Sequence, residues 1–498
     1  MNQPLQRRHV RSVMGLILVS AVFGTIPTPS NSDAGATAIQ NRRGALPGNA
    51  GSITFRIEPK TTPSVSEIDD AVKAVMEKGH VRGAALAIVQ GTHLVYTKGY
   101  TLAGANYPDV RPITYFRQAS VSKMVTAMAV YQLLQEKKLP NGLDTKLQSI
   151  LHLKTPAKVD RNEPLPGETL KPGQRRNPRP VNTVSTAPKD NRFDSITLRH
   201  LLEMSSGLDT DLDWADLPTA EAFGSALPVS AEQLASYCAS EKLWATPGDH
   251  ARQAYNNTGY LMLGLAVAKL RNASSFVEAI GPTLLRPLSI RRVRESRSLL
   301  SAQLPDEARY DADSPETDPS VMTPDRPAVP LGYGTENIQN FLGGGGLSAA
   351  VTDMARLLAA LSMKNSPILS NDTRLLMLDN AAKTNDGHAV TDQSGNKDNT
   401  HGCHGFDAVT KMGDGVYSGQ KGGYLVTARA RSTSRLTAYP SPSPGTAIQQ
   451  NRAVPKTSSG IRIFSRFWMP RESMTGVRPI FSLCMVCPRS VTWNTTGR

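Results

Sequence analysis

The chain has 498 residues and a net charge of +14, and 39% of its residues are hydrophobic. That length allows two or three domains, or one large α/β domain with insertions, and the composition fits a globular body and excludes a disordered one. Most of the charge lies at the ends, because residues 428–498 hold eleven Lys and Arg against one acid and residues 1–36 hold a net of two positive charges. The body between keeps only +2, so its charge gives no reason to expect a nucleic acid as partner.

The first 36 residues have the three parts of an export signal. Arginines within residues 7–11 precede an apolar run over 13–23, and polar sequence with a small-residue stretch follows. We expect residues 1–36 to be a signal peptide, residues 37–62 a linker, and the mature protein to be periplasmic or secreted. The apolar run is too short to span a bilayer and no later segment is apolar enough, so we expect no stable membrane span after signal removal.

Hydrophobic periodicity predicts the first elements of the body. Ser66 can cap an amphipathic helix that Gly79 closes. Extended runs over 84–89 and 94–100 predict two antiparallel strands. After a short extended segment, apolar side chains recur with a period near 3.6 over 120–137, which predicts a long helix.

The rest of the body is mostly helical in pattern. Residues 155–187 are rich in Pro, Asn, Arg and Lys without periodicity, so we expect a surface insertion there. Further elements are expected as helices over 198–204, 231–243, 258–270, 274–286, 351–362 and 370–380, and as a strand over 421–427. One strand block, many helices and a later strand predict an α/β sheet flanked by a helical region.

A serine hydroxyl needs an adjacent base to act as a nucleophile. The chain has no Gly-x-Ser-x-Gly elbow, but Ser120 and Lys123 are three residues apart at the start of the expected long helix, which puts both side chains on one side. A lysine follows Ser394 and Ser418 at the same spacing. Only Ser120 follows an extended segment and opens an amphipathic helix, so we predict Ser120 as the nucleophile.

Lys123 accepts a proton only when it is neutral, and burial or a nearby positive charge would lower its pKa in that direction. Lys421 is the candidate for that charge, and the two glycines after it would let a substrate lie against a strand edge. Tyr255 and Asn257 form the only Tyr-x-Asn of the chain, and a phenol between two ammonium groups could shuttle a proton. Taken alone, each segment fits a structural role better: a solvated lysine at a strand entry, and an Asn helix cap with a packing tyrosine.

Together and in this order, the fragments resemble the serine β-lactamase and penicillin-binding protein superfamily, in its class C-like branch. Residues 116–123 resemble the nucleophile segment, residues 247–260 the second motif, and residues 343–347 a glycine-rich segment late in these domains. The resemblance implies one domain over 63–427 with a β-lactamase/transpeptidase-like α/β fold, in which an antiparallel sheet is flanked by helices and accompanied by a mostly helical region.

The resemblance also implies a chemistry. Ser120 would be acylated, water would hydrolyse the acyl-enzyme, and Lys123 and Tyr255 would handle the protons. No cofactor and no metal would take part.

On the substrate side, the resemblance implies that Asn257 orients the substrate and that Lys421 supplies positive potential beside Gly423. The backbone N–H groups of Ser120 and Tyr424 would hold the oxyanion. The third motif departs from the family, because Lys-Gly-Gly lacks the Thr or Ser that often helps to bind a substrate carboxylate.

We therefore expect a serine hydrolase acting on small acyl or peptide substrates with ester, amide or β-lactam-like bonds, as an esterase, amidase or β-lactamase. A D-Ala-D-Ala carboxypeptidase is an alternative among enzymes. A catalytically silent, penicillin-binding-type sensor is the alternative from another class.

Two short motifs could bind a metal. His401, Cys403 and His404 lie in a glycine-rich loop without an acidic ligand, and Cys484 and Cys487 form a lone Cys-x-x-Cys. Neither is convincing, so we expect no metal site.

Residues 428–498 also depart from the family, which would continue with another strand and a C-terminal helix. This tail is rich in Arg, Ser and Pro and has one acid, so we expect a frame-shifted, non-native or disordered segment. Mass spectrometry of the expressed natural protein checks this. A frame shift predicts that no peptide spanning Ala453 to Lys456 is found, and detection of that peptide with its neighbours would contradict it.

Overall fold

The computed structural model describes residues 54–57, 65–79, 81–105, 107–159, 179–185, 188, 190–310, 317–384, 390–391, 397–398, 403–413, 415–425, 428–437 and 481–487. The expected signal peptide and most of the expected linker lie outside the described residues. Within these ranges, no helix combines the length and the apolar composition needed to cross a membrane.

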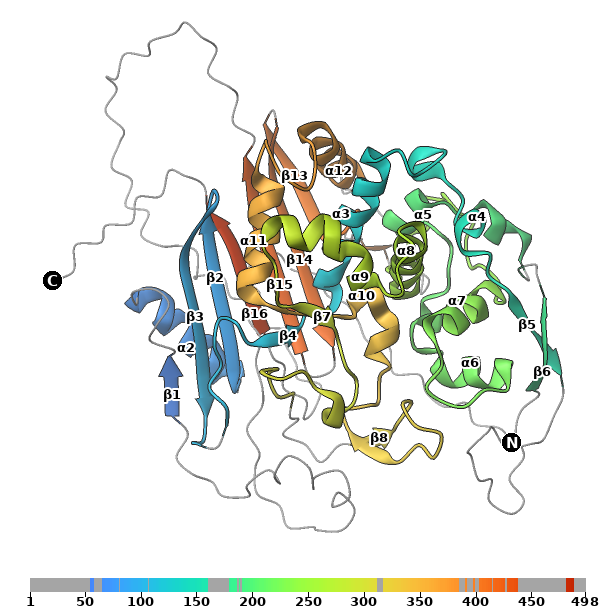
Figure 1. Cartoon of the computed structure of the whole chain (residues 1–498), viewed down its shortest axis with the longest axis horizontal. Helices are drawn as coiled ribbons and strands as arrows, with labels where there is room; N and C mark the ends of the chain where they lie inside the picture. The colour runs from blue at the N-terminus through green and yellow to red at the C-terminus, as the bar shows by residue number, and fades with distance from the viewer. Residues whose placement is uncertain are drawn as a thin grey trace, which may run out of the picture.

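A seven-stranded sheet stands on one side of the domain, and most helices gather on the other (Figure 1). The strand order across the sheet is β1-β3-β2-β16-β15-β14-β13. The strands are β1 (Thr54–Ile57), β2 (Gly83–Gln90), β3 (His93–Ala103), β13 (Ala408–Gly413), β14 (Val416–Leu425), β15 (Ala428–Thr437) and β16 (Phe481–Cys487). The expected antiparallel pair is confirmed as β2 and β3, with Ala84 opposite Tyr100.

Smaller sheets complete the strand content. An antiparallel three-stranded sheet joins β4 (Tyr115–Arg117), β10 (Leu347–Ala350) and β7 (Val293–Glu295). Two-stranded pairs are β5 (Thr155–Val159) with β6 (Arg179–Ser185), β8 (Thr317–Pro319) with β9 (Ala328–Pro330), and β11 (Val390–Thr391) with β12 (Lys397–Asp398). The β5–β6 pair falls in the expected surface insertion and lies at the edge of the helical half, near α6 (Figure 1).

The α-helices are α2 (Ser66–Gly79), α3 (Ser122–Gln135), α4 (Gln148–Leu151), α5 (Leu198–Leu202), α6 (Asp216–Phe223), α7 (Ala231–Ala239), α8 (Asn257–Leu270), α9 (Phe276–Ile280), α10 (Leu342–Gly345), α11 (Val351–Ser362) and α12 (Asn371–Thr384). Helix α11 packs across β2, β16 and β15, and α2 packs on β3. Because helices cover it, β2 buries a continuous apolar run over 84–89.

Helices α3 and α8 form the buried centre between the sheet and the helical half. Every residue over 122–133 of α3 is buried, as is every residue over 258–268 of α8, which explains why both helices are apolar on most sides. A Cβ on Gly264 of α8 would lie 2.9 Å from the Gly343 nitrogen, and one on Gly343 would lie 2.5 Å from Thr126 Oγ1. The glycine run at 343–346 therefore lets backbones approach closely.

The tail differs from its expectation in the parts that the structure describes. β15 pairs antiparallel with β14, and β16 lies between β15 and β2, parallel to both. The domain boundary expected at residue 427 was therefore placed too early, because the sheet continues through β15. Residues 481–487 are mostly apolar, as is typical of a strand that lies inside a sheet with a parallel partner on each side. The sequence analysis did not predict this strand, because the residues around it are rich in Arg, Ser and Pro. Beyond α12 no described residue is helical, so the expected C-terminal helix is not among them.

Arg117 ends β4 three residues before Ser120, and its side chain is fully buried. Its guanidinium donates to Gly332 O and Arg297 O, both at 2.6 Å, lies 3.7 Å from buried Glu307, and stacks on Tyr310. This cation thus connects β4, the strand before the predicted nucleophile Ser120, with the main chain at Arg297 and Gly332.

We predict that Arg117→Met lowers the free energy of unfolding by about 3–5 kcal/mol, because it leaves the Glu307 carboxyl without its buried partner. The control is Arg111→Met, which breaks the half-exposed pair with Asp306 and should cost less than about 1 kcal/mol. Urea denaturation of both variants measures the difference, and equal costs would contradict the role given to Arg117.

Candidate active site

Ser120 lies at the turn between β4 and α3. Ala119 has φ 47°, in the left-handed region, and a 3₁₀ turn over Ala119–Val121 precedes α3. A residue with a Cβ enters that region at a cost of about 1 kcal/mol, so the surroundings must hold the turn in place. Ser120 remains partly exposed, whereas Lys123 on the next turn is fully buried.

The Lys123 amine contacts three separate segments. Its Nζ lies 3.1 Å from Ser120 Oγ, 2.5 Å from Asn257 Oδ1 and 2.5 Å from the main-chain oxygen of Gly344. Burial is the main cause that lowers the Lys123 pKa, and the charge of Lys421 adds to it, while Tyr255 opposes both. The predicted nucleophile and base are therefore in direct contact.

Asp213, in the 3₁₀ helix Thr210–Trp214, fixes the orientation of Asn257. The Asn257 Nδ2 group donates to Asp213 at 2.8 Å, so the Asn257 carbonyl oxygen faces Lys123. Asp213 also accepts from the backbone N–H groups of Asn257 and Thr258 and from the Thr258 hydroxyl. Sequence reasoning missed this carboxylate, because nothing in its local pattern connects it with a residue 44 positions later.

Tyr255 lies between the two lysines. Its ring centroid is 4.8 Å from the Lys123 Nζ and 4.9 Å from the Lys421 Nζ, and Lys421 donates to its hydroxyl at 3.2 Å. Burial raises the pKa of the phenol, but the two positive charges outweigh it and a hydrogen bond with Ser120 adds to their effect. The Tyr255 pKa therefore lies below its ordinary value.

Lys421 has a counterion that the sequence did not indicate. The Lys421 side chain is 1% exposed, and its Nζ donates to Asp407 Oδ1 at 2.5 Å, while the Gly422 N–H donates to Asp407 Oδ2 at 2.5 Å. Burial lowers the pKa of Lys421, but the negative charge of Asp407 outweighs it, so this pKa is raised. Lys421 is thus held as a cation whose charge Asp407 balances.

Strand β14 passes directly beside the nucleophile. A Cβ on Gly423 would lie 2.6 Å from Gln118 O and 2.9 Å from the Ser120 nitrogen, so only glycine allows this approach. The next residue, Tyr424, has a side chain that is 58% exposed. The oxyanion-binding role of the Ser120 and Tyr424 N–H groups stays a prediction, and the close backbone approach is compatible with it.

The competing serines differ in their surroundings. Ser418 and Lys421 are three residues apart in β14, where such side chains point to opposite faces of the sheet. Ser394 lies outside the described residues. Of the serines considered, the structure shows only Ser120 in contact with a buried lysine.

The Beta-lactamase family model matches residues 68–438. The chain belongs to the Beta-lactamase family. The expected β-lactamase/transpeptidase-like α/β fold is confirmed by this match and by the sheets with flanking helices, whose described strand pairs are antiparallel except those of β16.

Individual relatives of this Beta-lactamase family member are distant. Protein flp of Staphylococcus aureus is 25% identical over 234 residues, which are 46% of this chain and 38% of that protein. The chain therefore spans well under half the length of that curated relative. Among solved structures, an octameric penicillin-binding protein homologue from Pyrococcus abyssi is 20% identical with a TM-score of 0.47, covering 73% of this chain and 69% of that one. A D-amino acid amidase from Ochrobactrum anthropi SV3 is 17% identical with a TM-score of 0.47, covering 72% and 85%.

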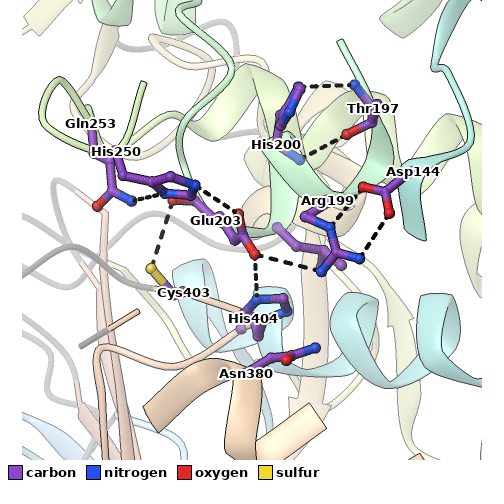
Figure 2. A network of polar contacts seen from close by, with 12 residues as sticks. Asp144, Thr197, Arg199, His200, Glu203, His250, Gln253, Asn380, Cys403 and His404 are labelled. Atoms are coloured by element: carbon purple, nitrogen blue, oxygen red, sulfur yellow. Dashed lines mark hydrogen bonds and ion pairs between the residues drawn. The ribbon is translucent and has the colours of Figure 1, made fainter. Parts of the chain in front are cut away.

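The weak metal motif proves to be part of a polar network in this Beta-lactamase family member (Figure 2). His404 is fully buried, with Nδ1 3.0 Å from the Tyr131 hydroxyl and Nε2 3.4 Å from Glu203. Glu203 also faces His250 at 3.7 Å, and Cys403 donates to its main-chain oxygen. Within the described part of the chain, no three His, Cys, Asp or Glu gather as metal ligands, and His401 lies outside it. The network ties the loop at 403–407 to the end of α5.

We predict that Lys421→Met shifts the ascending limb of the pH profile of kcat/KM to higher pH by about one unit. A general base gains activity as pH rises through its pKa, and Lys421 lowers the pKa of both Lys123 and Tyr255. Removing the Lys421 charge raises the pKa values of Lys123 and Tyr255. The Asp407 carboxylate, which has then lost its counterion, raises the Tyr255 pKa further. Because Lys123 and Tyr255 influence each other's titration, the pKa measured from the ascending limb describes the pair and not one residue.

The control is Lys411→Met on the neighbouring strand β13. This variant removes an equal charge from a more exposed ion pair, which Lys411 forms with Asp379 of α12. Its profile should match that of the unmodified protein. A limb that stays in place in Lys421→Met, or moves to lower pH, would contradict the proposed electrostatics.

Proposed function

We propose that the protein is a serine hydrolase that forms an acyl-enzyme on Ser120. The observation that carries this proposal is the set of partners around the Lys123 amine. A neutral amine has two N–H groups and one lone pair, and here two carbonyl oxygens, from Asn257 and Gly344, accept two N–H groups. The amine also contacts the Ser120 hydroxyl at 3.1 Å and lies beside the Tyr255 phenol, so a neutral Lys123 that donates to the two carbonyl oxygens can point its lone pair at the Ser120 proton.

In acylation, Ser120 Oγ forms a bond with the substrate carbonyl carbon while its proton moves to Lys123 Nζ. The carbonyl electrons move onto oxygen, and the backbone N–H groups of Ser120 and Tyr424 would stabilise that oxyanion; one such donor is worth about 10²–10³ in rate. When the bond to the leaving oxygen or nitrogen breaks, Tyr255 gives it a proton and takes one back from Lys123. Its position between the two lysines supports this role.

In deacylation, a water molecule attacks the acyl carbon and gives one proton to Lys123. The bond to Ser120 Oγ then breaks, and Lys123 returns the proton to that oxygen. The products are a carboxylic acid and the alcohol or amine released before; with a β-lactam ring the amine stays attached to the acyl group, so one ring-opened acid leaves. The site then returns to its starting state.

The substrates we propose are small acyl or peptide compounds with an ester, amide or β-lactam-like bond, met in the periplasm or outside the cell. The expected export signal supports this location, and the Beta-lactamase family supports the reaction class. Ester, amide and β-lactam hydrolysis are separated by assaying a nitrophenyl ester, a D-alanyl peptide and a chromogenic cephalosporin on one preparation.

We predict that Ser120→Ala abolishes hydrolysis and labelling by a fluorophosphonate probe, because the attacking oxygen is removed. Ser418→Ala is the matched control, since that serine has the same spacing to a lysine but lies in β14, and it should keep most of the activity. Intact mass spectrometry measures the label. A fully active Ser120→Ala protein would refute the assignment, and labelling of Ser120 without turnover of any substrate would favour the silent sensor.

A further inference from the structure

We infer that Asp407 makes the site select against substrates whose leaving group carries a carboxylate, so that the preferred substrates are uncharged esters or amides. The inference rests on the proposed function, since it names the substrate class of the same site. Asp407 is a specificity-determining residue in this reading.

The Asp407 carboxylate balances the positive charge of Lys421, which donates to the Tyr255 hydroxyl. Its Oδ1 accepts from the buried Lys421 ammonium at 2.5 Å, and the side chain of Asp407 is still 26% exposed. The Lys421 ammonium also donates a hydrogen bond to the Tyr255 hydroxyl at 3.2 Å. An incoming carboxylate would therefore meet a balanced ion pair with an accessible negative end, instead of a free cation.

The carboxylate also occupies the edge of β14 that a substrate must use. The backbone at Gly423 lies against the Ser120 nitrogen, so a molecule that acylates Ser120 lies beside residues 421–424. In that segment the Gly422 N–H donates to Asp407 Oδ2, and a Cβ on Gly422 would lie 3.3 Å from the same oxygen. The Gly422 N–H, which could otherwise bind a substrate carboxylate, is thus already bound to the Asp407 carboxylate. Gly422 also has no side-chain hydroxyl that could bind a substrate carboxylate in its place.

The loop that carries Asp407 is anchored on both sides. Cys403 and His404 both contact Glu203 in the network of Figure 2, and His404 Nδ1 also lies 3.0 Å from the Tyr131 hydroxyl. A Cβ on Gly405 would lie 2.7 Å from Met124 Cα, so the loop packs against α3, and the Asp407 N–H donates to Gln420 O at 2.8 Å. Because the loop is held at both points, Asp407 stays beside Lys421 while the substrate binds.

Like charges a few ångströms apart repel strongly where water is partly excluded. The matched probes are 3-carboxyphenyl butyrate, which is anionic at neutral pH, and its methyl ester, which is neutral. They share the acyl group, and dividing each kcat/KM by the rate of alkaline hydrolysis removes the difference in leaving-group reactivity. In the unmodified protein we expect the neutral ester to be favoured by about tenfold or more.

In Asp407→Asn we expect this preference to fall by about tenfold, because the amide keeps the size of the side chain and frees the Lys421 charge. Asp379→Asn is the matched control. Asp379 pairs with Lys411 and accepts from Tyr417 on the same sheet, so the variant removes an equal charge from a similar contact away from Ser120. It should keep the original preference.

A salt series on the unmodified protein tests the same idea without a substitution. Raising the ionic strength from about 0.01 M to 1 M shortens the Debye length from about 30 Å to 3 Å, so hydrolysis of the anionic ester should rise relative to the neutral one. This series decides the question if Asp407→Asn does not fold.

The outcomes separate the two proposals. An unchanged preference in a folded Asp407→Asn protein, or equal rates on both esters in the unmodified protein, would overturn the selectivity while leaving the hydrolase intact. Absence of hydrolysis of either ester together with absence of Ser120 labelling would overturn the proposed function, and the inference with it.

Discussion

The burial of one amine organises the candidate site. Lys123 comes from the first turn of α3, and its Nζ contacts a side chain of α8 and a main-chain oxygen of α10. Taking a lysine out of water lowers its pKa, so the packing that builds the centre of the domain also prepares Lys123 for its proposed role as base. Fold stability and the proposed catalysis therefore depend on the same contacts among these three helices.

The Lys421 ammonium and the Asp407 carboxylate lie farther from the Lys123 amine than its direct partners, and the Lys421 charge acts on the Lys123 pKa from that distance. Tyr255 separates Lys123 from Lys421, and Asp407 holds Lys421 in its charged form. A cation that is kept charged by a carboxylate can still lower the pKa of the phenol beside it, while its net attraction for anions is reduced. In the proposed mechanism, the same ion pair therefore influences both proton transfer and substrate choice.

The sequence alone was sufficient to predict the features of the fold and the site that depend on local residue patterns. The helix over 66–79 matches α2, and the Ser120 to Lys123 spacing on the next long helix placed the core of the site, because helical periodicity is local. The segment expected as a helix over 274–286 is helical but not α-helical throughout: α9 stops at Ile280 and a π-helix over Gly281–Leu285 follows, because Pro282 has no N–H for an α-helical hydrogen bond. Asp213 and Asp407 were missed because their partners are distant in sequence.

The glycines around the nucleophile limit how relatives of this protein can diverge. Side chains at Gly343, Gly344 or Gly423 would collide with Thr126, with the Asn257 main chain or with the turn before Ser120, so these positions cannot vary without moving the machinery. Gly422 is crowded only by the Asp407 carboxylate, and the Tyr424 side chain extends into solvent. Substitutions at those two neighbours on one strand can therefore alter which substrates this site accepts without moving the residues of the proposed reaction.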